Sequence, residues 1–278
     1  MEKLNFKEID LSTLEKIKSQ GTQSTIYTDG NKCYKFLDSL YPEEKSDLYK
    51  KFLDMDGMEI NGVLLPQDLI IEDSRLKGYT MEYFENSMPL SYKFLKRYFN
   101  CNELFVYVEK ASKILRNIHN NGIIYQDLSF ENILVDDKGN TMFCDIDGCS
   151  YKEHTSPFFS AIFKEFLVDY RNSKIYEEED IDKVSMILSF YLTLYAEVLQ
   201  KITKKQYHTL SDNIQTLENL RHIANMLVDK NRPIQDIPYL DEVIDLNDDY
   251  EIDRKKILTM KQRFNNTMYY LRTRARKR

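Results

Sequence analysis

The sequence predicts an α+β protein with two unequal parts, a small β-rich part followed by a larger, mainly helical one. Short stretches of β-forming residues, separated by turn signals, fill much of residues 14–84. Beyond Met88, apolar residues recur at helical spacing. A chain of 278 residues with 42% hydrophobic residues is long enough for two lobes and can bury a core. We therefore expect a first domain at residues 1–85 and a second at residues 86–278.

The composition excludes several classes of protein. The apolar runs are shorter than the ~20 residues that a membrane-spanning helix needs, and the N-terminus is charged from its second residue. Four cysteines in a chain of this length, without an export signal, are typical of reduced thiols rather than of a disulfide framework. We therefore expect a cytoplasmic protein without a membrane span.

The strands of the first domain are predicted from its turn signals. Gly21 and the sequence Asp-Gly-Asn at residues 29–31 divide residues 14–37 into short strands, and the second signal indicates a β-hairpin. Two further strands are expected within residues 68–84, on either side of a polar turn at residues 73–74. Together these stretches predict a β-rich layer.

One helix is expected between these two groups of strands, over residues 43–55. Pro42 suits its first turn, because proline is tolerated where the backbone N–H has no partner inside the helix. The apolar residues Leu48, Phe52 and Met55 fall on one face of this helix. We expect that face to pack on the strands.

The second domain is expected to begin with a long helix. Asn102 suits its N-cap, and Gly122 suits the left-handed residue after its end. Its apolar stripe consists of Leu104, Val108, Ala111, Leu115 and Ile118. Two short β-like runs follow, on either side of a turn at residues 138–140. Further helices are expected at about residues 182–201, 211–228 and 252–270.

Residues 125–148 carry the most specific chemical signal. Asp127 and Asn132 are five residues apart in D-L-S-F-E-N, and Asp145 follows Asn132 by thirteen residues in D-I-D-G. This spacing resembles that of the protein-kinase-like fold, in which the catalytic loop H-R-D-L-x-x-x-N is followed by the metal-binding D-F-G. Other landmarks occur in the family's order, so the resemblance covers most of the chain. It implies the two-lobed fold of that family.

The chain departs from the family pattern at several points. Tyr125 and Gln126 stand where the family has His and Arg, and Ile146-Asp147 stands where it has Phe-Gly. The expected phosphate-covering loop keeps a single glycine, Gly21, and no A-P-E motif follows Asp145. We expect the additional carboxylate of Asp147 to orient a neighbour rather than to bind metal.

The resemblance implies an ATP site in the first domain. Lys35 resembles the lysine of the V-A-I-K motif and would hold the α- and β-phosphates. Glu44 is our choice for the carboxylate that pairs with this lysine, with Glu43 and Asp47 as alternatives. The nucleotide would further contact Gly21, Ser24, Ile26, Cys33, Met81, Glu82, Phe84 and Leu134, with Met81 as gatekeeper and backbone groups of Glu82 and Phe84 bonded to adenine.

The resemblance also implies the catalytic residues. Phosphoryl transfer depends mainly on alignment and on neutralising charge on the phosphate oxygens. Asp127 would orient the acceptor hydroxyl and take its proton, while Asn132 and Asp145 would bind Mg²⁺ through oxygen atoms. Asp182 would anchor the backbone of the catalytic loop, and His119 would have a structural role.

These residues predict an ATP- and Mg²⁺-dependent serine/threonine protein kinase of bacterial type, which transfers the γ-phosphate to a protein hydroxyl. A small-molecule kinase resembling the aminoglycoside and choline kinases is one alternative, because of the single-glycine loop, the missing A-P-E motif and Ser129 in place of a lysine. A pseudokinase that binds nucleotide as a scaffold is the other alternative, suggested by Tyr125, Gln126 and the same loop.

Charge is unevenly distributed along the chain. The net charge is −6, and because the last seven residues, RTRARKR, carry +5, the rest carries −11. The acidic body argues against a broad nucleic-acid-binding face. The basic tail suits an acidic partner, such as anionic lipid or nucleic acid, or the C-terminal end of a helix, where the dipole favours positive charge.

Overall fold

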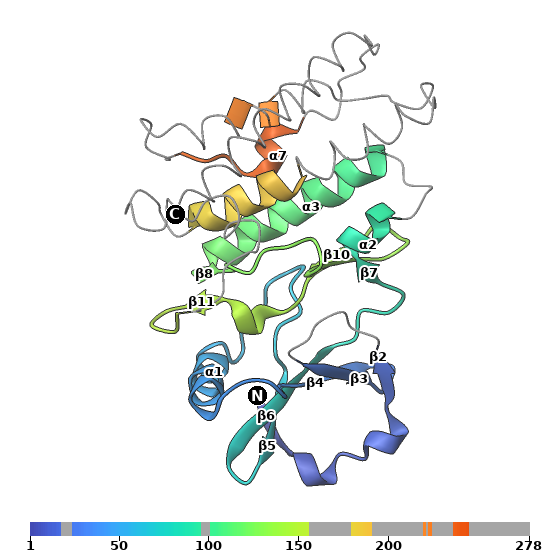
Figure 1. Cartoon of the computed structure of the whole chain (residues 1–278), viewed down its shortest axis with the longest axis vertical. Helices are drawn as coiled ribbons and strands as arrows, with labels where there is room; N and C mark the ends of the chain where they lie inside the picture. The colour runs from blue at the N-terminus through green and yellow to red at the C-terminus, as the bar shows by residue number, and fades with distance from the viewer. Residues whose placement is uncertain are drawn as a thin grey trace, which may run out of the picture.

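The structure, a computed structural model, describes residues 1–17, 24–95, 101–155, 179–190, 219–220, 222–223 and 236–244. It is an α+β protein in which a mixed sheet and one helix form the N-terminal part, and a long helix runs through the C-terminal part (Figure 1). Across these described ranges, no helix has both the length and the apolar character to cross a membrane. The basic tail and the helix expected at residues 252–270 lie outside the described residues.

The N-terminal sheet has the strand order β1-β5-β6-β4-β3-β2. Its strands are β1 (Glu2–Asn5), β2 (Glu15–Ile17), β3 (Thr25–Thr28), β4 (Lys32–Phe36), β5 (Asp68–Glu72) and β6 (Arg75–Glu82). β1 runs parallel to β5, and all other neighbours are antiparallel. Both predicted hairpins are present, β3–β4 and β5–β6. Asp73 and Ser74 both have positive φ in the second turn, as the right-handed twist of a tight hairpin requires.

Two features of the N-terminus were not predicted. β1 is followed by two short 3₁₀ turns, η1 (Phe6–Glu8) and η2 (Leu11–Thr13). β1 is largely exposed and has no apolar alternation, so its sequence carries little strand signal. It forms because β5, more than 60 residues further along, offers a free edge for hydrogen bonds.

α1 (Pro42–Asp54) lies between β4 and β5 in the chain, where the sequence predicts a helix. The predicted core-facing residues Leu48, Phe52 and Met55 are all buried. Phe52 packs edge-to-face on Tyr79 of β6, with ring centroids 4.9 Å apart. This contact holds the helix against the sheet.

The C-terminal part is built around α3 (Cys101–Asn120), which follows the short α2 (Leu90–Leu95). Its buried residues include Phe105, Val108, Ala111, Leu115 and Ile118, and Gly122 beyond its end has a φ of 73°. The predicted apolar stripe is therefore buried as expected at four of its five positions, and the side chain of the fifth, Leu104, is not among those that the structure describes. Because α3 already includes Cys101, Asn102 lies within the first turn rather than before it.

Other helical segments surround α3. Residues 179–190 are helical and overlap the helix predicted at about residues 182–201. Residues 219–220 and 222–223 are also helical and fall within the helix predicted at about residues 211–228. α7 (Leu240–Val243) packs against α3, and the Arg116 guanidinium lies over the ring of Tyr239 just before α7. Most of the helical residues expected after residue 190 lie outside the described part of the chain.

Very short strands shape the segment between α3 and residue 151. β7 (Met88–Pro89), β9 (Ile133–Val135) and β10 (Thr141–Phe143) form one sheet, and β8 (Ile123–Ile124) pairs with β11 (Ser150–Tyr151). The predicted turn at residues 138–140 joins β9 to β10. The 3₁₀ turn η3 (Ile146–Gly148) lies between β10 and β11. The β8–β11 pairing therefore brings together the two ends of residues 125–148, and β9 and β10 form a hairpin between those ends.

The segment between α1 and β5 joins the two parts of the molecule. The Phe143 N–H donates to the Gly62 carbonyl (2.7 Å), and the Leu64 N–H donates to the Phe143 carbonyl (2.8 Å). Gly62 has a φ of 87°, and a Cβ atom there would lie 2.6 Å from Ile114 of α3. Only glycine fits this close approach without displacing Ile114. Since Phe143 ends β10, these bonds fix the start of the D-I-D-G segment relative to the sheet.

His154 ties α1 to the chain that follows β11. Its Nδ1 lies 3.2 Å from Asp47 Oδ1 and its Nε2 lies 2.9 Å from Asp54 Oδ2, and both carboxylates belong to α1. Burial disfavours the charged imidazole, but the two carboxylates outweigh this and raise the pKa of His154 above its usual value. Both ring nitrogens then donate, which only the imidazolium can do.

We expect His154→Gln to lose stability mainly in acid and neutral solution. Because the folded state binds the proton more tightly than the unfolded state, the ion pair contributes fully below the ordinary pKa of about 6.5 and is lost as pH rises through the raised pKa. Thermal unfolding should show the largest gap between wild type and variant at about pH 6 and the smallest at about pH 9. A gap that does not change with pH would contradict the charged pair.

Candidate active site

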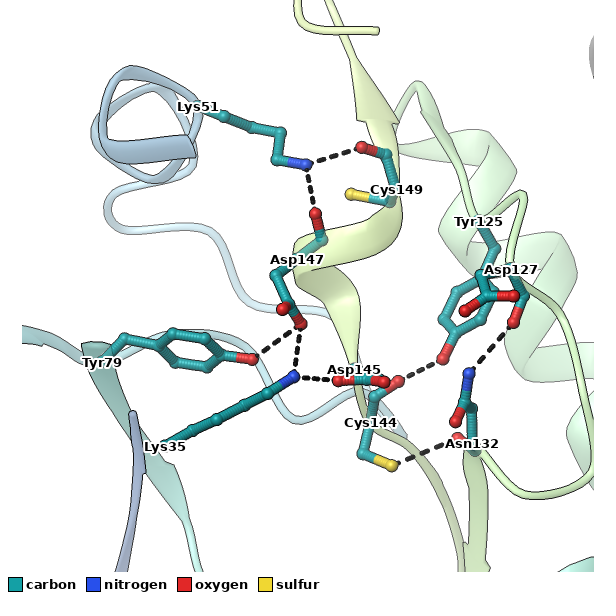
Figure 2. Close-up of polar contacts among 10 residues, drawn as sticks. All are labelled: Lys35, Lys51, Tyr79, Tyr125, Asp127, Asn132, Cys144, Asp145, Asp147 and Cys149. Carbon is teal, nitrogen blue, oxygen red and sulfur yellow. Dashed lines mark hydrogen bonds and ion pairs between the residues drawn. The ribbon is translucent and has the colours of Figure 1, made fainter. Parts of the chain in front are cut away.

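Lys35 of β4 lies at the centre of a cluster of polar side chains (Figure 2). Its ammonium contacts Asp145 Oδ1 and lies 2.7 Å from Asp147 Oδ1. The lysine is only 4% exposed, so these carboxylates rather than water compensate its charge. Burial alone would lower the pKa of Lys35, but Asp147 and Asp145 outweigh burial and hold it well above the usual value. The side chain is therefore a fixed positive charge.

Tyr79 of β6 completes the surroundings of this lysine. It stands opposite Lys35 in the β4–β6 ladder, and its hydroxyl donates to Asp147 Oδ1 at 3.0 Å. Burial, together with the charge of Asp147, raises the pKa of Tyr79 well above its usual value, so the phenol stays a neutral donor. Asp147 is thus held by one ammonium and one hydroxyl.

The two carboxylates that share Lys35 differ in environment. Burial acts against the charge of Asp147, but Lys35 and the bonds to that carboxylate outweigh it and lower its pKa. Burial and the nearby charge of Asp147 together raise the pKa of Asp145, against the effect of Lys35. The side chain of Asp145 is 41% exposed and that of Asp147 is 16% exposed. Asp147, to which Tyr79 also donates, is therefore the more firmly held of the two partners of Lys35. Asp145 is the carboxylate that an incoming cation can reach.

The backbone of Asp145 is held in an uncommon conformation. Its φ of 65° and ψ of 40° are left-handed, a region that non-glycine residues seldom occupy outside sites where neighbours enforce it. The preceding residue, Cys144, is fixed on both sides, since its N–H donates to the Asn132 carbonyl (3.0 Å) and its carbonyl accepts from the Tyr125 hydroxyl. Tyr125, which stands where the protein-kinase pattern has His, thus helps to hold the D-I-D-G segment.

The backbone before Asp127 is anchored by a buried carboxylate. Asp182 accepts hydrogen bonds from the N–H groups of Tyr125 (2.6 Å) and Gln126 (2.7 Å). His119 Nε2 lies 3.1 Å from the same carboxylate, and its Nδ1 lies 2.8 Å from the Tyr239 hydroxyl. Asp182 therefore binds the backbone just before Asp127, which is the contact that the resemblance implies, and His119 is buried.

Asp127 and Asn132 lie on the side of Asp145 that faces away from Lys35 (Figure 2). The Asn132 amide nitrogen donates to the Asp127 carbonyl at 3.0 Å, which fixes the orientation of the amide. A Cβ atom placed on Gly148 would lie 3.6 Å from the Cβ of Asp127, so this aspartate is next to the D-I-D-G segment. The sequence-predicted residues Lys35, Asp127, Asn132 and Asp145 therefore meet in one place.

Several of the predicted adenine contacts come from neighbouring strands. Cys33 and Met81 are buried opposite each other in the β4–β6 ladder, and Ile26 of β3 stands opposite Lys35. Leu134 lies in β9, between Asn132 and Asp145 in the chain, and is half-buried. Ser24 and Phe84 are half-buried and Glu82 is exposed, whereas Gly21 lies outside the described residues.

Glu44 does not reach Lys35, so this prediction is wrong. Its carboxylate accepts from the Tyr41 N–H at 2.7 Å, and the side chain is exposed. In the first turn of α1, a carboxylate satisfies a backbone N–H that has no partner inside the helix. Of the two alternatives, Asp47 contacts His154, and Glu43 is exposed in the same turn. Asp147 takes the position that we assigned to an acidic residue of α1.

Three residues that contribute to the cluster were not identified from the sequence. Tyr79 and Tyr125 donate through their hydroxyls, and Lys51 of α1 donates to the carbonyls of Asp147 and Cys149. Lys51 did leave a signal, because it is a charged residue on the apolar face of its helix. Tyr125 stands out in the sequence only as a departure from the protein-kinase pattern, and Tyr79 leaves no signal, since tyrosine is often largely buried.

The three described cysteines are free thiols, as expected. Burial raises the pKa of Cys33 and of Cys149 to about 11 and also raises that of Cys144. They are protonated at neutral pH and unsuited to nucleophilic chemistry.

The donor atoms around Asp145 suit a hard divalent cation. Asp145 offers an accessible carboxylate, and Asn132 offers an amide oxygen once its nitrogen is bonded to Asp127. Mg²⁺ prefers such oxygen ligands and keeps several waters, so few protein ligands suffice. Together with the ammonium of Lys35, the cluster could hold a polyphosphate and its metal.

Comparisons with known proteins do not place the chain in a family. The sequence matches no protein-family model and no curated protein. The function must therefore be argued from the residues of the cluster and their geometry.

We expect Asp147→Asn to weaken nucleotide binding about tenfold, whereas Glu44→Gln should change it less than twofold, about the range that surface substitutions give. Asparagine keeps the shape of Asp147 but removes one of the two negative charges that Lys35 contacts, which leaves Asp145 as its remaining charged partner. Calorimetric titration with an ATP analogue measures both variants. Equal effects of the two substitutions would show that the ion pair between Asp147 and Lys35 does not contribute to nucleotide binding.

Proposed function

We propose that this chain is an ATP- and Mg²⁺-dependent phosphotransferase with a protein-kinase-like fold. Its two lobes would be the sheet with α1 (residues 1–85) and the mainly helical remainder (residues 86–278). The observation that carries the proposal is the convergence of Lys35, Asp127, Asn132 and Asp145 on one site, although Lys35 and Asp145 are 110 residues apart in the chain. Such a set of charges and oxygen donors suits phosphoryl transfer.

In this proposal each residue has a separate task. Lys35, held by Asp147, binds the α- and β-phosphates, and Asp145 and Asn132 provide oxygen ligands for the metal. A bound Mg²⁺ would neutralise the charge on the phosphate oxygens. Asp127 orients the acceptor hydroxyl and accepts its proton as the γ-phosphate is transferred. Alignment and charge, rather than covalent catalysis, carry the reaction.

Two departures from the protein-kinase pattern, Tyr125 and Gln126, are compatible with an active enzyme. Tyr125 and Gln126 present their backbone N–H groups to Asp182, and the Tyr125 hydroxyl supports Cys144. Neither departure removes a side chain to which we assign a role in phosphate transfer. The free thiols are in keeping with the reducing cytoplasm.

We further propose a serine or threonine of a protein as acceptor. The helices after Asp182 that would contact the acceptor lie largely outside the described residues, so the acceptor class is decided by assay. The full chain is incubated with γ-labelled ATP and Mg²⁺, once with a lysate and once with aminoglycosides and choline, and each reaction is repeated with a chelator. Asp127→Ala replaces the wild type in a parallel set.

The outcomes of this assay are distinct. Chelator-sensitive label on serine or threonine, absent with Asp127→Ala, supports the proposal. Label confined to a small molecule keeps the phosphotransferase and overturns the protein acceptor. Nucleotide binding with no transfer to any acceptor, including the chain itself, overturns the enzyme and favours the pseudokinase.

A further inference from the structure

A buried lysine joins α1 to the D-I-D-G segment. Lys51 is 5% exposed, and its ammonium donates to the carbonyls of Asp147 (2.8 Å) and Cys149 (2.6 Å). Figure 2 shows it reaching from α1 to the main chain of Asp147, whereas Lys35 meets the side chain of the same residue. The two partners are 96 and 98 residues away in the chain. Lys51 therefore makes a direct tertiary link between the helix and the site.

Stability gives no reason for a lysine at this position. Lys51 lies among Leu48, Phe52 and Met55 on the apolar face of α1, where an apolar side chain would be buried at less cost. Among the residues that the structure describes, no carboxylate lies within 4.0 Å of its ammonium. Within the described part of the chain, the two carbonyl oxygens are the partners of this ammonium, so the role of the lysine follows from the segment to which it donates.

The two carbonyls belong to the turn that sets the position of the site carboxylates. They lie on either side of Gly148, immediately after the carboxylate of Asp147 that pairs with Lys35. Asp145, two residues earlier, has a left-handed backbone that its surroundings must enforce. Tyr125 holds this turn from the C-terminal part through Cys144, and Lys51 holds it from α1.

We infer that Lys51 is a positioning residue that couples the place of α1 to the geometry of the metal-binding turn. The inference rests on the proposed function for its effect on Mg²⁺. In the kinase pattern an acidic residue of this helix pairs with the nucleotide lysine. Here the pairing acid, Asp147, is on the turn itself, and α1 holds the backbone of that turn through a cation. A displacement of α1 would thus alter metal binding at Asp145.

The test compares Lys51→Met with Lys50→Met, which removes the same charge from an exposed position one residue earlier on α1. Binding of a non-hydrolysable ATP analogue is measured with and without Mg²⁺. For Lys51→Met we expect binding with Mg²⁺ to weaken about tenfold or more, as for residues that orient metal ligands, and metal-free binding to change less than about twofold. Lys51→Arg should recover part of the loss, and Lys50→Met should match the wild type.

Hydrogen exchange without nucleotide provides a second readout that does not depend on catalysis. Lys51→Met should speed exchange of the amides of residues 145–149 relative to Lys50→Met, and if it does not fold, Lys51→Gln takes its place. Equal exchange and equal Mg²⁺ effects in the two methionine variants would overturn the inference. A wild type that binds no nucleotide would instead overturn the proposed function, while exchange would still decide the coupling.

Discussion

Replacing Asp145 by asparagine is expected to lower Mg²⁺-dependent phosphate transfer about a thousandfold. A metal ion contributes several kcal/mol to stabilising the charge of the transition state, and each 1.36 kcal/mol corresponds to about a tenfold change in rate. Lys35 contacts both carboxylates, but Tyr79 also donates to Asp147, and Asp145 is the more exposed of the two, so Asp145 is the carboxylate that a cation can reach. Asparagine keeps the shape and one oxygen but not the charge.

The measurement is initial velocity against Mg²⁺ concentration, with Asp137→Asn as the control. Asp137 is an exposed aspartate in the turn between β9 and β10, and the same change there should leave the rate within about twofold of wild type. Nucleotide binding without metal should persist in Asp145→Asn, because Lys35 and Asp147 remain. Transfer at a wild-type rate in Asp145→Asn would exclude Asp145 as a metal ligand.

Asp127→Asn is expected to reduce kcat by ~10²-fold or more while the KM for ATP stays nearly constant, because the base acts on the acceptor hydroxyl and not on the nucleotide. Two of the contacts that hold this loop do not involve the Asp127 carboxylate. Asn132 donates to the main-chain carbonyl of Asp127, and Asp182 holds the preceding backbone, so neither bond involves the side chain that changes. The loop should therefore keep its shape.

Single-turnover and steady-state rates of phosphate transfer measure this effect, with Glu131→Gln, an exposed carboxylate of the same loop, as the control. A similar loss in both variants would indicate a general effect of charge near the site. An unchanged rate in Asp127→Asn would mean that another group accepts the proton.

The elements that the sequence predicts correctly are those with local signals. The two hairpins follow from turn residues, and α1 and α3 follow from apolar residues at helical spacing. β1, β7, β8 and β11 have at most four residues each, and their partners are distant in the chain. No local sequence pattern predicts such strands, because they form only when the partner strand is in place.

For the site, the sequence by itself determined which residue types are present and how they are spaced. Asp127, Asn132 and Asp145 stand out because their spacing within a short segment is visible without a fold. Only the tertiary structure decided that Asp147 rather than Glu44 pairs with Lys35, and that Lys51 grips the same turn. These pairings join segments about 100 residues apart in the chain. Whether two such groups meet depends on how the helix and the strands pack, and the spacing of residues along the chain does not specify that packing.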